Sequence, residues 1–118
     1  MNWVKALPEG ALQEGTREVV TLENRKVVLL KHQGELYAIN NSCPHLKMSM
    51  KKGKITEDGA IVCPFHRSAF DLKTGEVKDW CPWPPLVGKA LGSIKEQQNL
   101  PVFPTRIEDG SIWVGFSA

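Results

Sequence analysis

The residues most suited to chemistry are two cysteine–histidine pairs in short segments. Residues 43–45 read Cys-Pro-His, residues 63–66 read Cys-Pro-Phe-His, and seventeen residues lie between them. Thiolate and imidazole groups both bind soft or borderline metals. Two short segments that each supply two such groups can hold one metal centre from opposite sides. The sequence therefore predicts a metal site with four ligands: Cys43, His45, Cys63 and His66.

The order of the ligands within each pair narrows the choice of metal. Structural zinc sites usually pair Cys with Cys and His with His. Here each segment supplies one Cys and one His, which suits a centre with two inequivalent metals. In a Rieske [2Fe–2S] cluster both thiolates bind one iron and both imidazoles bind the other. A Cys2His2 zinc site is the alternative that the residue types leave open.

The segment that follows the second pair resembles the Rieske family. Residues 66–77 read HRSAFDLKTGEV, similar to the family's run His-Gly-x-x-Phe-Asp-x-x-Thr-Gly. The departure is Arg67, where the family usually has Gly. Either the turn is less relaxed with Arg, or the position does not require a positive φ. The resemblance extends more weakly from about Trp3 to Phe116. It implies one [2Fe–2S] cluster per chain, with the two imidazoles bound through Nδ1.

Two further positions distinguish subclasses of the family. Quinol-oxidising Rieske proteins carry an additional Cys in each segment, and those two cysteines form a disulfide. This chain has Met48 and Phe65 there, so it looks like the soluble Rieske-type ferredoxins that feed electrons to oxygenases. The resemblance implies a one-electron carrier, not an enzyme, between a flavoprotein reductase and an oxygenase-type or similar acceptor. The alternative is a Rieske-like subunit or accessory module of a larger reductase or membrane-associated complex. The presence of all four ligands favours the carrier.

The resemblance also assigns roles around the cluster. Ser68 matches a family serine that donates a hydrogen bond to a bridging sulfide, and Phe70 stands where high-potential members carry a donating Tyr. One donor kept and one lost predicts a potential in the lower part of the range of roughly −150 to +300 mV. Pro82 falls in the proline-rich residues 81–85, which are expected to cover the cluster. The alternative for that segment is a surface turn pinned by prolines.

Basic residues gather near the predicted ligands. The segment between Cys43 and Ser68 contains five cationic side chains and only two anionic ones, Glu57 and Asp58. Its net charge is therefore +3, compared with +2 for the whole chain. Any single lysine here is ordinarily a solvated surface residue. Their concentration beside the histidines nevertheless predicts docking to an acidic redox partner. We name these residues the basic cluster: Lys47, Lys51, Lys52, Lys54 and Arg67.

Length and composition bound the remaining options. The chain of 118 residues, 42% hydrophobic and 24% charged, fits one globular domain. Its net charge implies no global attraction to nucleic acid. No apolar run approaches the roughly 20 residues that span a bilayer, and the N-terminus lacks the pattern of a signal peptide. We expect a cytoplasmic monomer. His32, the only other histidine, is expected to be a solvated turn residue.

Short strand-like segments at regular spacing predict an all-β, antiparallel fold. By resemblance this is the Rieske fold, a β-sandwich or barrel base (residues 1–40 and 77–118) with an inserted two-loop cluster-binding subdomain (about 41–76). Residues 89–99 are predicted to form one or two helical turns. Hairpin turns are expected at Glu23-Asn24, Gln33-Gly34 and Asp109-Gly110. The predicted strands are Asn2–Leu7, Arg17–Leu22, Lys26–Lys31, Leu36–Asn40, Ile55, Ala60–Cys63, Ser68–Leu72, Val77–Trp80, Pro101–Glu108 and Ser111–Phe116.

Overall fold

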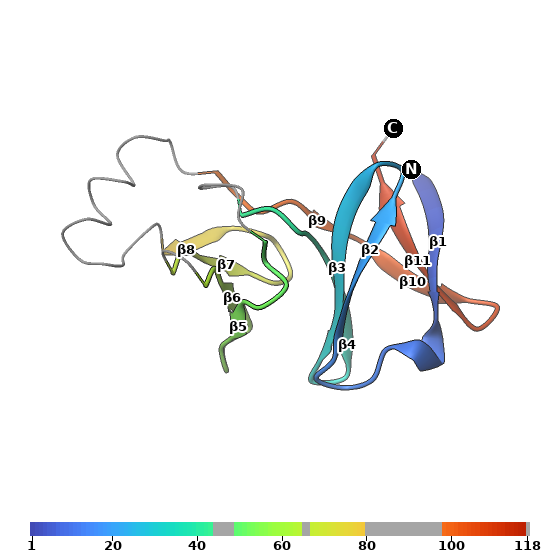
Figure 1. Ribbon diagram of the computed structural model, residues 1–118, viewed down its shortest axis with the longest axis horizontal. Helices are drawn as coiled ribbons and strands as arrows, with labels where there is room; N and C mark the ends of the chain where they lie inside the picture. Colours follow the sequence, from blue (N-terminus) through green and yellow to red (C-terminus); the bar gives the residue numbers. More distant parts are fainter. Residues whose placement is uncertain (44–48, 65–66, 80–97, 118) are drawn as a thin grey trace. The chain divides into compact units, whose positions relative to one another are not determined.

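The computed structural model describes residues 1–43, 49–64, 67–79 and 98–117, and in them the protein is built from antiparallel strands (Figure 1). The chain divides into two compact units. The first unit contains Met1–Asn40 and Val102–Ala118, and the second contains Asn41–Pro101. The all-β fold class predicted from the sequence is confirmed.

One sheet of the first unit has the strand order β2-β3-β4-β9. Its first turn has φ values of 49° and 67° at Glu23 and Asn24, and its second has 51° and 79° at Gln33 and Gly34. Positive φ at both central residues is the conformation of a type I′ hairpin turn, in which Asn and Gly are favoured. The strands are β2 (Arg17–Leu22), β3 (Arg25–His32), β4 (Glu35–Asn40) and β9 (Val102–Phe103).

The other sheet of this unit joins the two ends of the chain. Its strand order is β1-β11-β10, so the N-terminal strand pairs with the C-terminal one. The hairpin between β10 and β11 turns at Asp109 and Gly110, with φ values of 52° and 74°. A 3-10 turn, η1 (Glu9–Ala11), follows the first strand. The strands are β1 (Asn2–Pro8), β10 (Thr105–Glu108) and β11 (Ser111–Phe116).

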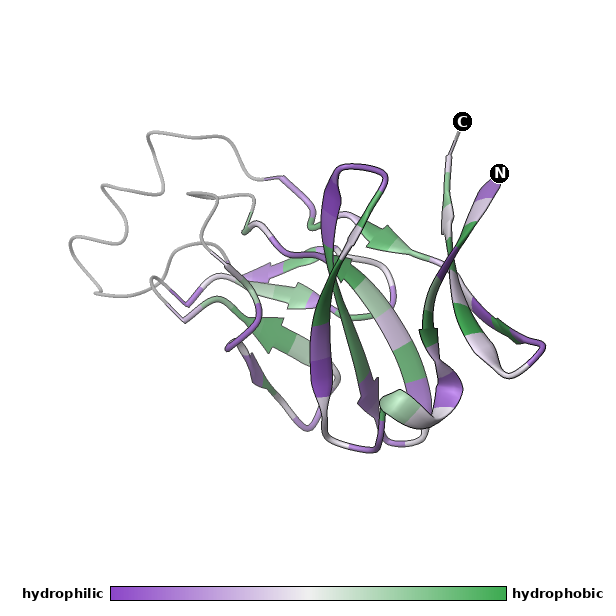
Figure 2. Cartoon of the chain, turned by 45° about the vertical axis from the view of Figure 1, so that its right-hand side comes forward, coloured by the Kyte–Doolittle hydropathy of each residue, from purple (hydrophilic) through white to green (hydrophobic). Residues whose placement is uncertain are grey.

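The core of the first unit follows from strand alternation. Val27 and Leu29 on β3 and Val114 on β11 are fully buried and belong to one apolar cluster. Side chains two residues apart in a strand share a face, so β3 and β11 give this cluster every second residue. In Figure 2 hydrophobic and hydrophilic positions alternate along the strands. The buried members are Leu12, Leu22, Val27, Leu29, Ala38, Ile112, Val114 and Phe116.

The second unit contains a four-stranded meander with the order β5-β6-β7-β8. Its interior contains Met50, Ile61, Phe70 and Leu72, each at most 2% exposed. Leu100 is also buried, and its N–H donates to the Gly75 carbonyl at 2.8 Å. This hydrogen bond holds the segment that precedes β9 against the turn between β7 and β8. The strands are β5 (Lys54–Ile55), β6 (Ala60–Val62), β7 (Ala69–Asp71) and β8 (Val77–Asp79).

Two sequence expectations need correction. The strand predicted over residues 101–108 is two strands, because β9 pairs with β4 while β10 pairs with β11. Pro104 stands between them, and it lacks the N–H that a continuous ladder would need. His32 is the last residue of β3, half-buried rather than solvated. Its Nε2 is buried and makes no hydrogen bond to a described residue.

Several predicted features lie outside the described residues. They include the helical turns expected within residues 89–99 and the proline-rich segment 81–85 with Pro82. In the described part of the chain, no helix has the length and apolar character needed to cross a membrane.

Candidate metal-cluster site

The first ligand-bearing segment leaves the end of β4 and is closed at its base. Ser42 and Ser49 form an isolated antiparallel bridge. The Met50 N–H donates to the Asn41 carbonyl at 2.7 Å, and the Ser49 hydroxyl donates to Asn41 Oδ1 at 3.0 Å. Cys43 directly follows the bridge and is only 1% exposed. The first predicted thiolate is therefore held in the interior, at the entrance of a pinched loop.

The second segment connects β6 and β7 and is closed in the same way. The Cys63 N–H donates to the Ser68 carbonyl at 2.8 Å, and the Arg67 N–H donates to the Cys63 carbonyl at 3.0 Å. Cys63 is 3% exposed, and Ser68 and Phe70 are fully buried. The sequence placed these residues near the cluster, and the structure places them in the interior of one hairpin.

The backbone at Arg67 shows whether the position where the family usually has Gly requires a positive φ. Its φ is +61°, in the left-handed region. A residue with a Cβ occupies this region at a cost of about 1–2 kcal/mol, whereas Gly enters it freely. The turn thus has the shape for which the family's usual Gly is suited, and Arg67 occupies it with a long cationic side chain.

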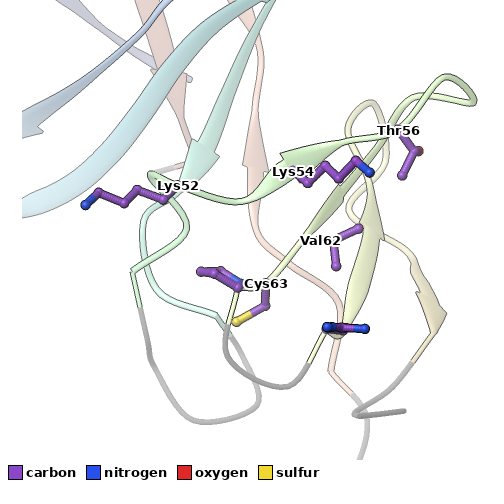
Figure 3. A pocket seen from close by; sticks show the side chains of 7 residues that line it. Lys52, Lys54, Thr56, Val62 and Cys63 are labelled. Atoms are coloured by element: carbon purple, nitrogen blue, oxygen red, sulfur yellow. The ribbon is translucent and has the colours of Figure 1, made fainter. Parts of the chain in front are cut away.

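The two segments adjoin within the second unit. Ser49 and Lys51, from the end of the first segment, line a recess of about 230 Å³ together with Pro64 of the second. A larger recess of about 530 Å³ brings Lys52 and Lys54 together with Cys63 and Arg67. Figure 3 shows Lys52, Lys54, Thr56, Val62 and Cys63 around this larger recess. Lys52, Lys54 and Arg67 of the basic cluster therefore lie beside one of the predicted thiolates.

The outcome for the other predicted residues is mixed. His45, His66 and Lys47 lie outside the described residues. Because only two of the four predicted ligands are described, no group of three metal-binding side chains occurs in the described part of the chain. Lys51 lines the smaller recess, separate from Lys54 and Arg67.

Near the basic cluster, Lys78 forms ion pairs that the sequence did not predict. The Nζ atom of Lys78, on β8, lies 3.2 Å from Oδ2 of Asp58 and 3.8 Å from Oδ2 of Asp71. The Thr56 hydroxyl and then Lys78 lower the pKa of Asp58 below its usual value. Asp58 is thus paired with a cation from outside residues 43–68. The short spacing of β6, β7 and β8 in the sequence could have indicated this pairing, because a three-strand meander brings β8 beside β7.

The donor set of the described residues fits an iron–sulfur cluster. Two buried cysteine side chains stand on adjoining loops. Ser68 places a hydroxyl in the same interior. Soft sulfur ligands select zinc, Cu(I) or iron–sulfur clusters, so these residues agree with the cluster that the ligand order predicted.

The fold and the site define the class of protein. The family model described as the Rieske [2Fe-2S] domain matches residues 2–104, and the chain belongs to this family. The resemblance inferred from residues 43–77 is confirmed.

Individual relatives narrow the comparison. The chain is 32% identical over 115 residues to the ferredoxin subunit of 3-phenylpropionate/cinnamic acid dioxygenase from Escherichia coli (strain K12), covering 97% of this chain and 93% of the relative. It is 28% identical over 104 residues to the ferredoxin component of the alkene monooxygenase system of Xanthobacter autotrophicus (strain ATCC BAA-1158 / Py2), covering 88% of this chain and 73% of that one. Both relatives are ferredoxin components of oxygenase systems.

Two kinds of solved structure share this fold, a ferredoxin and part of an oxygenase. The ferredoxin of carbazole 1,9a-dioxygenase from Nocardioides aromaticivorans IC177 superimposes with a TM-score of 0.74 at 20% identity, covering 97% of both chains. The terminal oxygenase of carbazole 1,9a-dioxygenase from the same organism gives 0.76 at 26% identity, covering 99% of this chain but 30% of that chain. The chain therefore matches a ferredoxin along its length, and it matches only one part of the oxygenase.

Proposed function

We propose that this protein is a one-electron carrier that holds one Rieske [2Fe–2S] cluster and passes electrons from a reductase to an oxygenase. The observation that carries the proposal is the near-complete mutual coverage with a dioxygenase ferredoxin subunit, 97% of this chain and 93% of the relative. The oxygenase structure, by contrast, continues far beyond the matched region. The 32% identity to a dioxygenase ferredoxin subunit supports electron transfer as the role of this chain.

Four residues would hold the cluster. Cys43 and Cys63 would bind one iron as thiolates, and His45 and His66 would bind the other as neutral imidazoles. The bound cluster supplies one-electron redox chemistry. Two neutral ligands in place of two thiolates reduce the negative charge of the centre, which favours reduction. The pinched bases of both loops fix the two cysteines, and their burial keeps water away from the sulfur atoms.

The remaining assignments rest on the same family. Residues of about 41–76 form the proposed cluster-binding subdomain, within the unit Asn41–Pro101. The missing cysteines at positions 48 and 65 agree with a reducing compartment, so we assign the protein to the cytoplasm. We propose a monomer that meets its reductase and its acceptor in turn. Size-exclusion chromatography with light scattering tests the oligomeric state.

Metal content and spectroscopy after anaerobic purification test the carrier function. We expect two irons and two sulfides per chain, a red-brown colour, and a rhombic paramagnetic resonance signal after reduction. His45→Cys should shift the spectrum towards that of an all-thiolate cluster or abolish it. His32→Cys is the matched control, because it changes the remaining histidine and should leave the spectrum unchanged. A colourless protein with one zinc per chain would contradict the proposal.

A further inference from the structure

Arg67 combines an unfavourable backbone conformation with a place beside the proposed cluster. Its φ of +61° suits Gly, and its exposed side chain gains no stability from burial. The turn imposes this conformation on the backbone, and the side chain remains exposed beside Cys63. In the same recess as Arg67 lie two other cations, Lys52 and Lys54. We call the residues of this recess the basic pocket: Lys52, Lys54, Thr56, Val62, Cys63, Pro64 and Arg67.

The two lysines of the basic pocket are not paired with a described acidic residue. In the described part of the chain, neither Lys52 nor Lys54 has an ion-pair partner. Asp58 is instead paired with Lys78 at 3.2 Å. The wall of the pocket includes Cys63, one of the proposed ligands. An acidic group that approaches this pocket would therefore meet cations next to the redox centre.

The geometry of the lysines distinguishes a broad docking surface from a small-anion site. In Figure 3 the side chains of Lys52 and Lys54 extend in opposite directions from neighbouring positions above Cys63 and Val62. Ammonium groups that extend apart favour several separate acidic groups over a single phosphate-sized ion. They can each meet a separate carboxylate on a protein surface, where complementary charge mainly raises the association rate.

From these observations we propose that the basic pocket docks an acidic surface of a redox partner protein, with Arg67 as a specificity-determining residue. The proposal rests on the carrier function. It adds the sign of the partner's charge, and it gives Arg67 a reason to occupy a Gly-like position. The docked partner would lie against the pocket wall that contains Cys63. The redox step itself transfers one electron and makes or breaks no bond.

Charged inorganic oxidants test the sign of this surface. One electron from the reduced protein converts ferricyanide to ferrocyanide, or tris(phenanthroline)cobalt(III) to cobalt(II). We expect the rate with the ferricyanide anion to fall as salt rises and the rate with the cobalt cation to rise, because screening removes attraction or repulsion. The Lys52→Glu/Lys54→Glu variant should lower the ratio of the ferricyanide rate to the cobalt rate about tenfold or more. Lys73→Glu, an exposed lysine of the same unit outside the pocket, should change the ratio by less than about twofold.

Arg67→Gly separates docking from a structural role. Glycine removes the cost of the left-handed conformation, so the midpoint of thermal unfolding should stay the same or rise. The loss of the charge should nevertheless slow the reaction with ferricyanide. Arg67→Lys keeps the charge and should react nearly as the natural protein does. Unchanged rates in Arg67→Gly and in the double lysine variant would overturn the proposal.

Hexaglutamate binding, measured by calorimetry, keeps the test independent of the cluster. The peptide should bind far more tightly than monomeric glutamate or inorganic phosphate at matched ionic strength, because its several carboxylates can meet several cations at once. Binding should be lost in Lys52→Glu/Lys54→Glu and retained in Lys73→Glu. Phosphate binding equal to that of the peptide would assign the pocket to a small anion and overturn the proposal. A protein that lacks iron but binds hexaglutamate would refute the carrier function while retaining the acidic-ligand surface.

Discussion

Cys63 and Ser68 are joined by their backbones, with the Cys63 N–H donating to the Ser68 carbonyl at 2.8 Å. Both residues are at most 3% exposed. This bond closes the second loop and fixes the proposed ligand and the proposed hydrogen-bond donor relative to each other. A backbone contact of this kind is independent of the serine side chain, so substitutions of Ser68 can probe the hydroxyl while the loop stays closed.

Ser68→Ala should lower the reduction potential. A hydrogen bond from the hydroxyl to a cluster sulfide is stronger when the cluster is reduced, so its loss disfavours reduction. If the difference is about 1 kcal/mol, the potential falls by on the order of 40 mV for one electron. Protein-film voltammetry measures it. Ser111→Ala removes the other buried serine of the described residues and should leave the potential unchanged; equal shifts in both variants would contradict the role of Ser68.

Phe70→Tyr should raise the potential. Phe70 is fully buried on β7, where the family's high-potential members carry a tyrosine that donates to a cysteine sulfur. A new donor near a ligand sulfur stabilises the reduced state by an amount similar to that expected for Ser68. Phe70→Leu, which adds no donor, is the matched control. A potential that falls or stays constant in Phe70→Tyr would show that the hydroxyl points away from sulfur.

Gly53→Ala should destabilise the second unit. A Cβ at this position would lie 2.7 Å from the Val62 carbonyl oxygen and 2.9 Å from Cγ1 of Ile61. Relief requires movement of β6, which leads directly to Cys63, at a cost of about 1–3 kcal/mol. Denaturant unfolding measures the cost, and iron content reports any loss of cluster. Gly10→Ala is the control, because its Cβ would meet no atom within 4 Å. Equal stability of the two variants would show that β6 yields without cost.

Glu14→Gln should make the first unit less stable at neutral pH, with a difference that disappears in acid. The Glu14 carboxylate accepts hydrogen bonds from the N–H groups of Gly34 at 2.7 Å and Gln33 at 2.8 Å. The hydrogen bond from Gly34 has the largest effect and lowers the pKa of Glu14, and the bond from Gln33 also lowers it. Desolvation raises the pKa, but the net result is a pKa below its usual value. A lowered pKa contributes stability above that value, and the contribution is lost as the pH falls through the folded-state pKa.

Thermal unfolding of Glu14→Gln and the natural protein at several pH values tests this sign. The gap between their midpoints should narrow from pH 4.5 downward. Glu18→Gln, which neutralises an exposed carboxylate on β2, accounts for the change in net charge. A gap that stays constant across this range would show that the charge of Glu14 does not support the turn at Gln33 and Gly34.

The sequence alone determined the local features of this protein. Glu23-Asn24 and Asp109-Gly110 form the predicted hairpin turns because Asn and Gly tolerate positive φ. The order of Cys and His in two short segments was enough to indicate the Rieske family, because the ligands of each pair are close in sequence. The Arg67 conformation could not be read from its residue type, which ordinarily avoids the backbone shape that the loop requires.

Only the tertiary structure decided which distant segments meet. Pro104 divides one predicted strand between two sheets, and the choice of β4 and β11 as partners depends on pairing across the whole chain. The burial of Cys43 and Cys63 likewise depends on the closure of two separate loops. The charge count of the basic cluster was available from the sequence. The pairing of Asp58 with Lys78, and the grouping of Lys52, Lys54 and Arg67 beside Cys63, arise because the meander folds back on itself.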